Sequence, residues 1–114
     1  MRQLTEVVAV CQAGHMVLEI AELTIRSGEE DSFAAAYDRA AHLVGDSPGC
    51  VSIRMTRGIE SPSRFVLLVE WERLTDHTEG FRESPSFQSW RDEVGRYFAE
   101  PPRVEHVVDL HVSC

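Results

Sequence analysis

The residues best suited to chemistry lie close together in the sequence: His77 stands among the aromatic residues Trp71, Phe81, Phe87 and Trp90. Histidine titrates near neutral pH, so His77 is a candidate general base or hydrogen-bond donor. Aromatic rings can form the walls of an apolar cavity and stack on a flat ligand. A purely structural reading also fits, with the aromatic residues in a core and His77 exposed near the start of a helix.

Two further residues are candidates for contact with a ligand. Arg54 alternates with Ser52 and Thr56 along a predicted strand, and its guanidinium is a candidate partner for a substrate anion. Tyr97 lies on a helical apolar stripe from which its hydroxyl can point inward. The chain has 19 acidic residues, so solvation or ion pairing explains Arg54 equally well. Core packing alone explains Tyr97.

The elements that must position these residues follow from periodicity and turn signals. Ser27 and Glu30 have the spacing of a capping box, which predicts that a helix begins there. Ser84 followed by Pro85 predicts a second helix start. In chain order, the sequence predicts a strand over 17–26, a helix ending near 44, strands over 51–56 and 64–72, helices over about 75–82 and 84–100, and a strand over 104–110.

This order is βαββαβ, the α+β ferredoxin-like arrangement with an antiparallel sheet. Two helices cover only one face of a four-stranded sheet, and Phe65, Leu67, Val69 and Trp71 share the face that they would cover. Val66, Leu68 and Val107 leave the opposite face apolar. Because monomers rarely expose a large apolar patch, we expect this face to pack against a second copy, giving a homodimer.

Length and charge limit the function classes. With 114 residues the chain is one domain, with residues 1–15 expected to form an N-terminal extension that need not be ordered, and 16–112 the folded unit. A net charge of −8 disfavours nucleic-acid and anionic-membrane partners. No apolar run is long enough to span a bilayer. Three cysteines, Cys11, Cys50 and Cys114, share no metal-ligand spacing and fit a reducing cytoplasm.

Missing residue types and motifs exclude several chemistries. The chain contains no lysine, so Schiff-base chemistry is excluded. It has no P-loop, dinucleotide fingerprint, nucleophile elbow or zinc motif, so we expect no cofactor. His106 and His111 are five residues apart and face opposite ways on a regular strand, which argues against a metal site.

One segment resembles a known family. It is the strand over 65–71 that ends on Trp71, followed by Leu74-Thr75-Asp76-His77, Phe81 and Ser84-Pro85-Ser86-Phe87-Gln88-Ser89-Trp90. This pattern resembles the antibiotic biosynthesis monooxygenase family of dimeric α/β barrels. The resemblance implies a cofactor-independent monooxygenase that oxidises an electron-rich phenol, anthrone or hydroquinone with O₂. It makes His77 the base or donor, Trp71 and Trp90 the stacking walls, and Arg54 a possible anion partner.

Two other branches of the same superfamily bear on the function. Haem-degrading members need an asparagine in the first strand and a histidine in the later helix. This chain has no asparagine, and Trp90 and Arg91 stand where that histidine would fall, so haem degradation is disfavoured. Other members are small-quinol oxidases or isomerases, or proteins with no demonstrated reaction. A small-ligand-binding or stress-related barrel without catalysis therefore remains the alternative.

Overall fold

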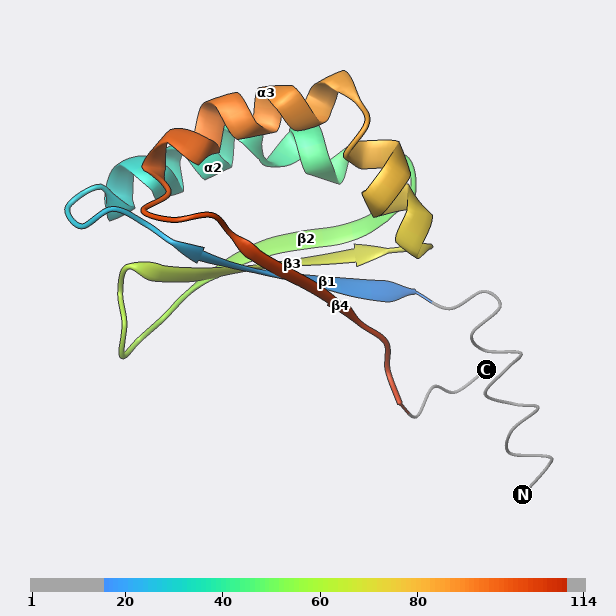
Figure 1. Ribbon diagram of the computed structural model, residues 1–114, viewed down its shortest axis with the longest axis horizontal. Helices are drawn as coiled ribbons and strands as arrows, with labels where there is room; N and C mark the ends of the chain where they lie inside the picture. The colour runs from blue at the N-terminus through green and yellow to red at the C-terminus, as the bar shows by residue number, and fades with distance from the viewer. Residues whose placement is uncertain (1–15, 111–114) are drawn as a thin grey trace.

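A four-stranded antiparallel sheet carries two helices on one face (Figure 1). The structure is a computed structural model and describes residues 16–110. The predicted extension over 1–15 lies outside the described residues. The elements are β1 (Val17–Thr24), α2 (Glu30–Gly45), β2 (Cys50–Arg57), β3 (Arg64–Trp71), the π-helix η1 (Asp76–Phe81), α3 (Pro85–Val94), the 3₁₀-helix η2 (Gly95–Tyr97) and β4 (Arg103–Val107). The sheet order is β2-β3-β1-β4, and every neighbouring pair is antiparallel. The α+β ferredoxin-like prediction is confirmed, and the sheet is open.

The core lies between the sheet and the helices. Alternate residues of β3 are buried, as the period-2 pattern predicted, and Trp71 is fully buried at the strand end. The helix α2 buries the stripe Phe33, Ala36, Ala40 and Val44 against this face. This burial of apolar side chains is what holds the helices on the sheet.

The predicted capping box at Ser27 is wrong in detail. The helix α2 begins at Glu30, and its first flanking residue is Glu29, which makes no side-chain cap. The carboxylate of Glu30 does reach back, but it accepts the N–H of Gly28 at 2.9 Å and the hydroxyl of Ser63 at 2.6 Å. Gly28 has a positive φ of 91°, so the chain turns there before the helix can start.

The remaining element ends match the prediction in part: β1 ends at Thr24 rather than at 26, and α3 ends at Val94, followed by η2, rather than near 100. Ser84 caps α3 by accepting the N–H of Phe87, and Pro85 is at the first position, as predicted. Thr75 flanks η1, but its side chain makes no cap. The last strand ends at Val107 rather than at 110, and Val108 and Leu110 are exposed.

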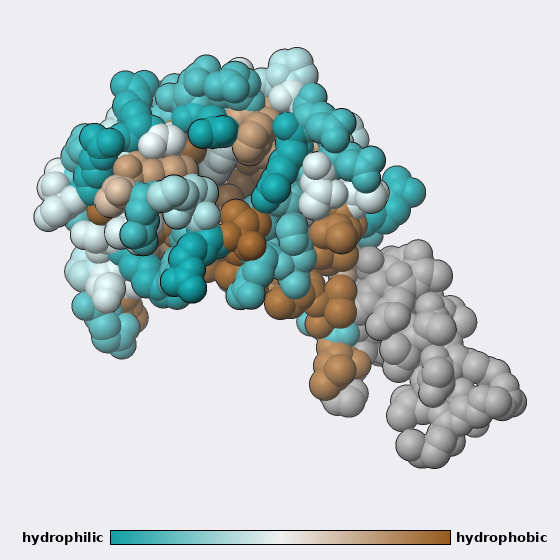
Figure 2. Space-filling model, in the orientation of Figure 1, coloured by the Kyte–Doolittle hydropathy of each residue, from teal (hydrophilic) through white to brown (hydrophobic). Residues whose placement is uncertain are grey.

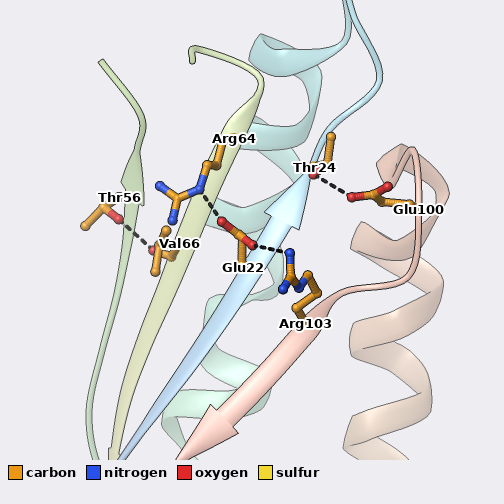
Figure 3. Close-up of polar contacts among 7 residues, drawn as sticks. All are labelled: Glu22, Thr24, Thr56, Arg64, Val66, Glu100 and Arg103. Carbon is orange, nitrogen blue, oxygen red and sulfur yellow. Dashed lines mark hydrogen bonds and ion pairs between the residues drawn. The ribbon is translucent and has the colours of Figure 1, made fainter. Parts of the chain in front are cut away.

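The face of the sheet opposite the helices is called the outer face here. It carries Leu18 and Ile20 of β1 with Val66 and Leu68 of β3, all half-buried. Glu22 lies on the same face between Arg64 and Arg103 and forms ion pairs with both (Figure 3). No helix among the described residues covers this face (Figure 1). None of the helices within 16–110 is long and apolar enough to cross a membrane.

Candidate functional site

A cavity of about 870 Å³ lies between the helix-facing side of the sheet and helix α3. Its size is in the range of pockets that hold small organic ligands. Figure 2 shows the hollow beneath the helices, with apolar surface inside it and hydrophilic residues around its mouth. The apolar part of the lining includes Leu23, Val44, Leu67, Phe81, Phe87 and Trp90. The ionisable part includes Glu19, His77, Arg82, Arg91, Asp92 and Glu100.

Two of these ionisable side chains are buried, Glu19 at 6% exposure and His77 at 3%. The indole N–H of Trp71 donates to Glu19 Oε1 at 2.9 Å. His77 Nε2 lies 3.4 Å from the same oxygen. A buried carboxylate needs such partners, because leaving it without hydrogen bonds in an apolar interior is costly.

A second histidine extends this cluster. His77 Nδ1 is 2.8 Å from His106 Nε2, a hydrogen-bond distance. If Nε2 of His77 carries the proton that faces Glu19, then His77 Nδ1 accepts from His106. The half-buried His106 is paired in register with Glu19 across β1 and β4. Glu19, His77 and His106 therefore form one connected polar chain.

The surroundings shift the pKa of each member. Burial raises the pKa of Glu19 above its usual value, and the hydrogen bond from Trp71 and the charge of Arg82 partly offset that rise. Burial, Arg82 and His106 lower the pKa of His77 to about 4. Burial and Arg82 also lower the pKa of His106. His77 is therefore neutral at pH 7 and has one nitrogen to donate and one to accept.

Aromatic contacts fix the orientation of these groups. The rings of Trp71 and His77 are stacked with centroids 5.3 Å apart. Phe81 meets Phe87 edge to face at 5.5 Å, and Tyr37 meets Trp90 edge to face at 6.2 Å. Packed rings with few rotatable bonds make a stiff wall.

The local chain path explains how His77 reaches the sheet. The strand β3 ends at Trp71, and the N–H of Glu72 donates to the carbonyl of Gly49 at 2.8 Å. The N–H of Arg73 donates to the side chain of Asp76 at 3.0 Å, which reverses the chain. The π-helix η1 then brings His77 back over Trp71. Single π turns of this kind are uncommon and often occur at functional sites.

The structure brings most of the predicted site residues together. His77, Phe81, Phe87 and Trp90 line the cavity. Trp71 lies behind His77 and is linked to the cavity wall through Glu19. Their roles remain predictions.

The other two predicted site residues lie elsewhere. Tyr97 packs edge to face on Phe33 at 6.3 Å and is not among the residues that line the cavity. Arg54 is paired in register with Leu68, so it belongs to the outer face of the sheet. It cannot contact a ligand in the cavity of its own chain.

Sequence reasoning missed Glu19, His106 and Arg82. A signal for Glu19 exists, because it alternates with Ala21 and Leu23 on the strand face that the helices cover. A carboxylate in such a row needs a buried donor. The contact between His77 and His106 joins residues 29 apart in the sequence, so it requires the tertiary fold. Within residues 16–110 there is no group of three or more His, Cys, Asp or Glu side chains arranged to hold a metal ion.

Comparison with known proteins identifies relatives of this chain. A curated protein of Bacillus subtilis (strain 168), the uncharacterised YczJ, is 39% identical over 95 residues, which is 83% of this chain and 100% of YczJ. A crystal structure from Bordetella bronchiseptica, provisionally named an antibiotic biosynthesis monooxygenase, is similar with a TM-score of 0.82 and 39% identity. The match covers 85% of this chain and 99% of that one.

A more distant structure shares the fold. SnoaB of Streptomyces nogalater, a cofactor-independent oxygenase crystallised as a point mutant, is similar with a TM-score of 0.73 at 14% identity. That match covers 86% of this chain and 96% of SnoaB. The sequence profile of antibiotic biosynthesis monooxygenases matches residues 16–93. The chain therefore belongs to the antibiotic biosynthesis monooxygenase family.

Proposed function

We propose that this protein is a cofactor-independent monooxygenase that oxidises an electron-rich aromatic substrate with O₂ in the cavity beneath α3. The observation that carries the proposal is the buried polar chain of Glu19, His77 and His106 on the wall of an otherwise aromatic cavity. A ligand of this class has a flat apolar ring and a weakly acidic hydroxyl or methylene group. The cavity offers aromatic side chains for the ring and ionisable side chains for the acidic group.

The aromatic walls would hold the ring of the substrate. Phe81, Phe87 and Trp90 come from η1 and α3 and face the sheet across the cavity. A ring bound there loses contact with water and gains stacking and edge-to-face contacts. The cation of Arg91, 5.8 Å from the centroid of Phe87, adds charge near the wall.

The reaction needs little from the protein beyond stabilising the deprotonated, anionic form of the substrate. A deprotonated phenol or anthrone is electron-rich enough to pass one electron to O₂, after which the two radicals combine. For an anthrone, one O₂ supplies one oxygen atom to the new carbonyl group, and the other leaves as water with two hydrogens from the substrate. Arg82 lines the cavity and stabilises a developing negative charge there.

We infer that two chains form a homodimer through the outer face of the sheet. Its half-buried apolar residues, Leu18, Ile20, Val66 and Leu68, have no covering helix within the described chain. Glu22 joins Arg64 and Arg103 across β3, β1 and β4, so charges on that face are already paired and can be covered together (Figure 3). Packing one copy on another is the simplest closed arrangement for such a face.

We expect the protein to work in the reducing cytoplasm. Cys50 is a free thiol in the described part of the chain. Burial raises the pKa of that thiol, which keeps it protonated and less reactive.

Oxygen uptake tests the proposed function. Metal-free, cofactor-free protein is mixed with anthrones, naphthols and hydroquinones, and the products are identified by mass spectrometry. We expect uptake that yields a quinone one oxygen heavier and two hydrogens lighter than the anthrone. Ala21 is buried and lines the cavity, so Ala21→Leu should fill part of it and lower uptake at least ~10-fold through lost binding.

The matched control is Ala35→Leu, on the exposed side of α2. It makes the same substitution away from the cavity and should leave uptake unchanged. Binding of a ligand without oxygen uptake across the panel would instead identify a non-catalytic ligand-binding protein. Equal uptake by both variants would place the reaction outside this cavity.

A further inference from the structure

Glu19 is the buried group best placed to take a proton from a bound ligand. Its carboxylate lines the cavity, and both of its partners within residues 16–110 meet the same oxygen, Oε1. Oε2 is therefore left to accept a proton from the ligand. The indole N–H of Trp71 holds the carboxylate in place, as a positioned general base requires.

His77 alone is a weak proton acceptor. It lies in an environment that disfavours its charged form, and its pKa is lowered to about 4. It is also in contact at both nitrogens, with Glu19 on one side and His106 on the other. A neutral imidazole between two polar groups is well suited to pass a proton on, since it can accept at one nitrogen while it releases from the other.

His106 gives a proton a route from the buried polar chain to solvent. It is half-buried on the edge strand β4, whose other residues are exposed. His106 lies within hydrogen-bond distance of His77, which connects it to the buried end of the polar chain formed by Glu19, His77 and His106. The three side chains therefore run from the cavity wall to the surface beside β4.

We propose that Glu19 is the catalytic base of this cavity and that His77 and His106 relay the proton from Glu19 to solvent. The inference rests on the proposed oxygenase function and assigns its first step. In that step a C–H or O–H bond of the substrate breaks, the electron pair stays on the substrate as its anion, and the proton bonds to Glu19. The transfer uses the other neutral tautomer of His77, in which Nδ1–H donates to His106 Nε2 and Nε2 is free to accept. The protonated carboxyl of Glu19 turns its O–H toward His77 Nε2, the proton moves to Nε2, His77 Nδ1 releases one to His106 Nε2, and His106 releases one to solvent.

Charged and titratable groups from each neighbouring element act on this base. Arg82, which follows η1, and the indole N–H of Trp71 at the end of β3 both favour the carboxylate. His77 of η1 lies 3.4 Å from it, and His106 of β4 is its partner in register. Arg91 and Asp92 of α3, with Glu100, also line the cavity. The balance leaves the pKa of Glu19 raised, mainly through burial, so the base becomes active at a higher pH than an exposed glutamate would.

Proton abstraction can be measured without oxygen. Under anaerobic conditions in D₂O, the wild-type protein should exchange the methylene hydrogens of anthrone for deuterium, followed by mass spectrometry. Glu19→Gln keeps the shape and the acceptor for Trp71 but removes the base. We expect it to lower exchange at least ~100-fold while anthrone binding, followed by tryptophan fluorescence, stays within a few fold.

The matched control is Glu72→Gln, an exposed carboxylate one residue beyond Trp71. It should exchange at the wild-type rate. The wild-type rate should rise with pH through the raised pKa of Glu19, and this inflection should vanish in Glu19→Gln. Wild-type exchange by a folded, ligand-binding Glu19→Gln protein would overturn the assignment.

The relay has its own readout. His106→Gln leaves the base in place but interrupts the exit, so exchange should slow and added imidazole should restore it. Imidazole should not restore Glu19→Gln. A slow His106→Gln variant that imidazole does not rescue would overturn the relay.

The outcomes separate this inference from the proposed function. Wild-type exchange without oxygen uptake would remove the oxygenase function and leave the base assignment standing. Oxygen uptake that survives in Glu19→Gln would remove the base assignment and leave the oxygenase function standing.

Discussion

Two buried ionisable side chains, Glu19 and His77, give the site its character at the scale of single residues. They lie within 3.4 Å of each other, and burial acts on them in opposite directions. It raises the pKa of the carboxyl and lowers that of the imidazole, because each loses stability when charged away from water. Both groups therefore tend toward their neutral forms. A carboxyl with a raised pKa is a stronger base than usual once it is ionised.

The lowered pKa of His77 predicts a pH-dependent contribution to stability. Its folded pKa is about 4, below the ordinary 6.5, so between these values the unfolded chain binds the extra proton. The contribution of His77 is full above pH 6.5 and is lost as pH falls toward 4. Relative to His77→Gln, the wild type should therefore gain up to ~3 kcal/mol between pH 4 and 7.

Urea unfolding of both proteins at fixed protein concentration checks this difference. His42→Gln, at an exposed histidine of α2, serves as the control for replacing a histidine away from the site. A difference between wild type and His77→Gln that stays constant from pH 4 to 7 would contradict the buried, neutral state of His77.

At the scale of elements, the turn before β2 and the start of η1 are packed together. Gly49 has a φ of 86°, and a Cβ there would collide with the carboxylate of Asp76. Asp76 is the residue before His77 and accepts the N–H of Arg73. The glycine thus lets η1 approach closely enough to place His77 on Trp71.

Two glycine substitutions isolate this contact. Gly28 also has a positive φ, of 91°, but a Cβ there would meet nothing within 4 Å. Gly28→Ala should destabilise the fold by about 1 kcal/mol through backbone strain alone. Gly49→Ala should destabilise by roughly 1–3 kcal/mol more, because Asp76 must move.

Chemical denaturation measures both variants, and ligand binding shows whether η1 has shifted. We expect weakened binding in Gly49→Ala and normal binding in Gly28→Ala. Equal destabilisation of the two would mean that the contact with Asp76 does not hold η1.

The same scale shows what the sequence could and could not predict. Alternation in β3 predicted which of its residues are buried, because the period of a strand decides which side chains share a face. The start of α2 was misplaced, since the Ser27 pattern did not reveal the positive φ at Gly28. The pairing of His77 with His106 depends on the register of β4 against β1, which local sequence does not encode. Glu19 was within reach of prediction, since it alternates with Ala21 and Leu23 along β1, but the sequence analysis did not assign the two faces of that strand.

At the scale of the whole molecule, the layered fold separates two surfaces with different tasks. The helices and the inner face of the sheet enclose the cavity, whereas the outer face is left without a covering element in the described chain (Figure 1). Arg54 belongs to the outer face with Leu68. Arg54, which the sequence analysis proposed as an anion partner in the site, therefore lies on the surface that we assign to the dimer interface.

The dimer assignment predicts the effect of one charge on that face. Leu68→Glu places a carboxylate between Ile20 and Arg54 on that face, and a facing copy would have to bury both charges, whose desolvation cost can exceed their attraction. We expect the wild type to elute as a dimer and Leu68→Glu as a folded monomer in size-exclusion chromatography with light scattering. Ala35→Glu, on exposed α2, should remain dimeric. A monomeric wild type would remove the assignment.

The most direct test of the whole account is a single reaction under ¹⁸O₂. Metal-free, cofactor-free protein is given an anthrone that it binds, and the product is examined by mass spectrometry. The account predicts a quinone that carries one ¹⁸O atom, formed at least ~100-fold faster than by Glu19→Gln. A ligand recovered unchanged from the folded wild-type protein, or a quinone whose new oxygen comes from water, would contradict it.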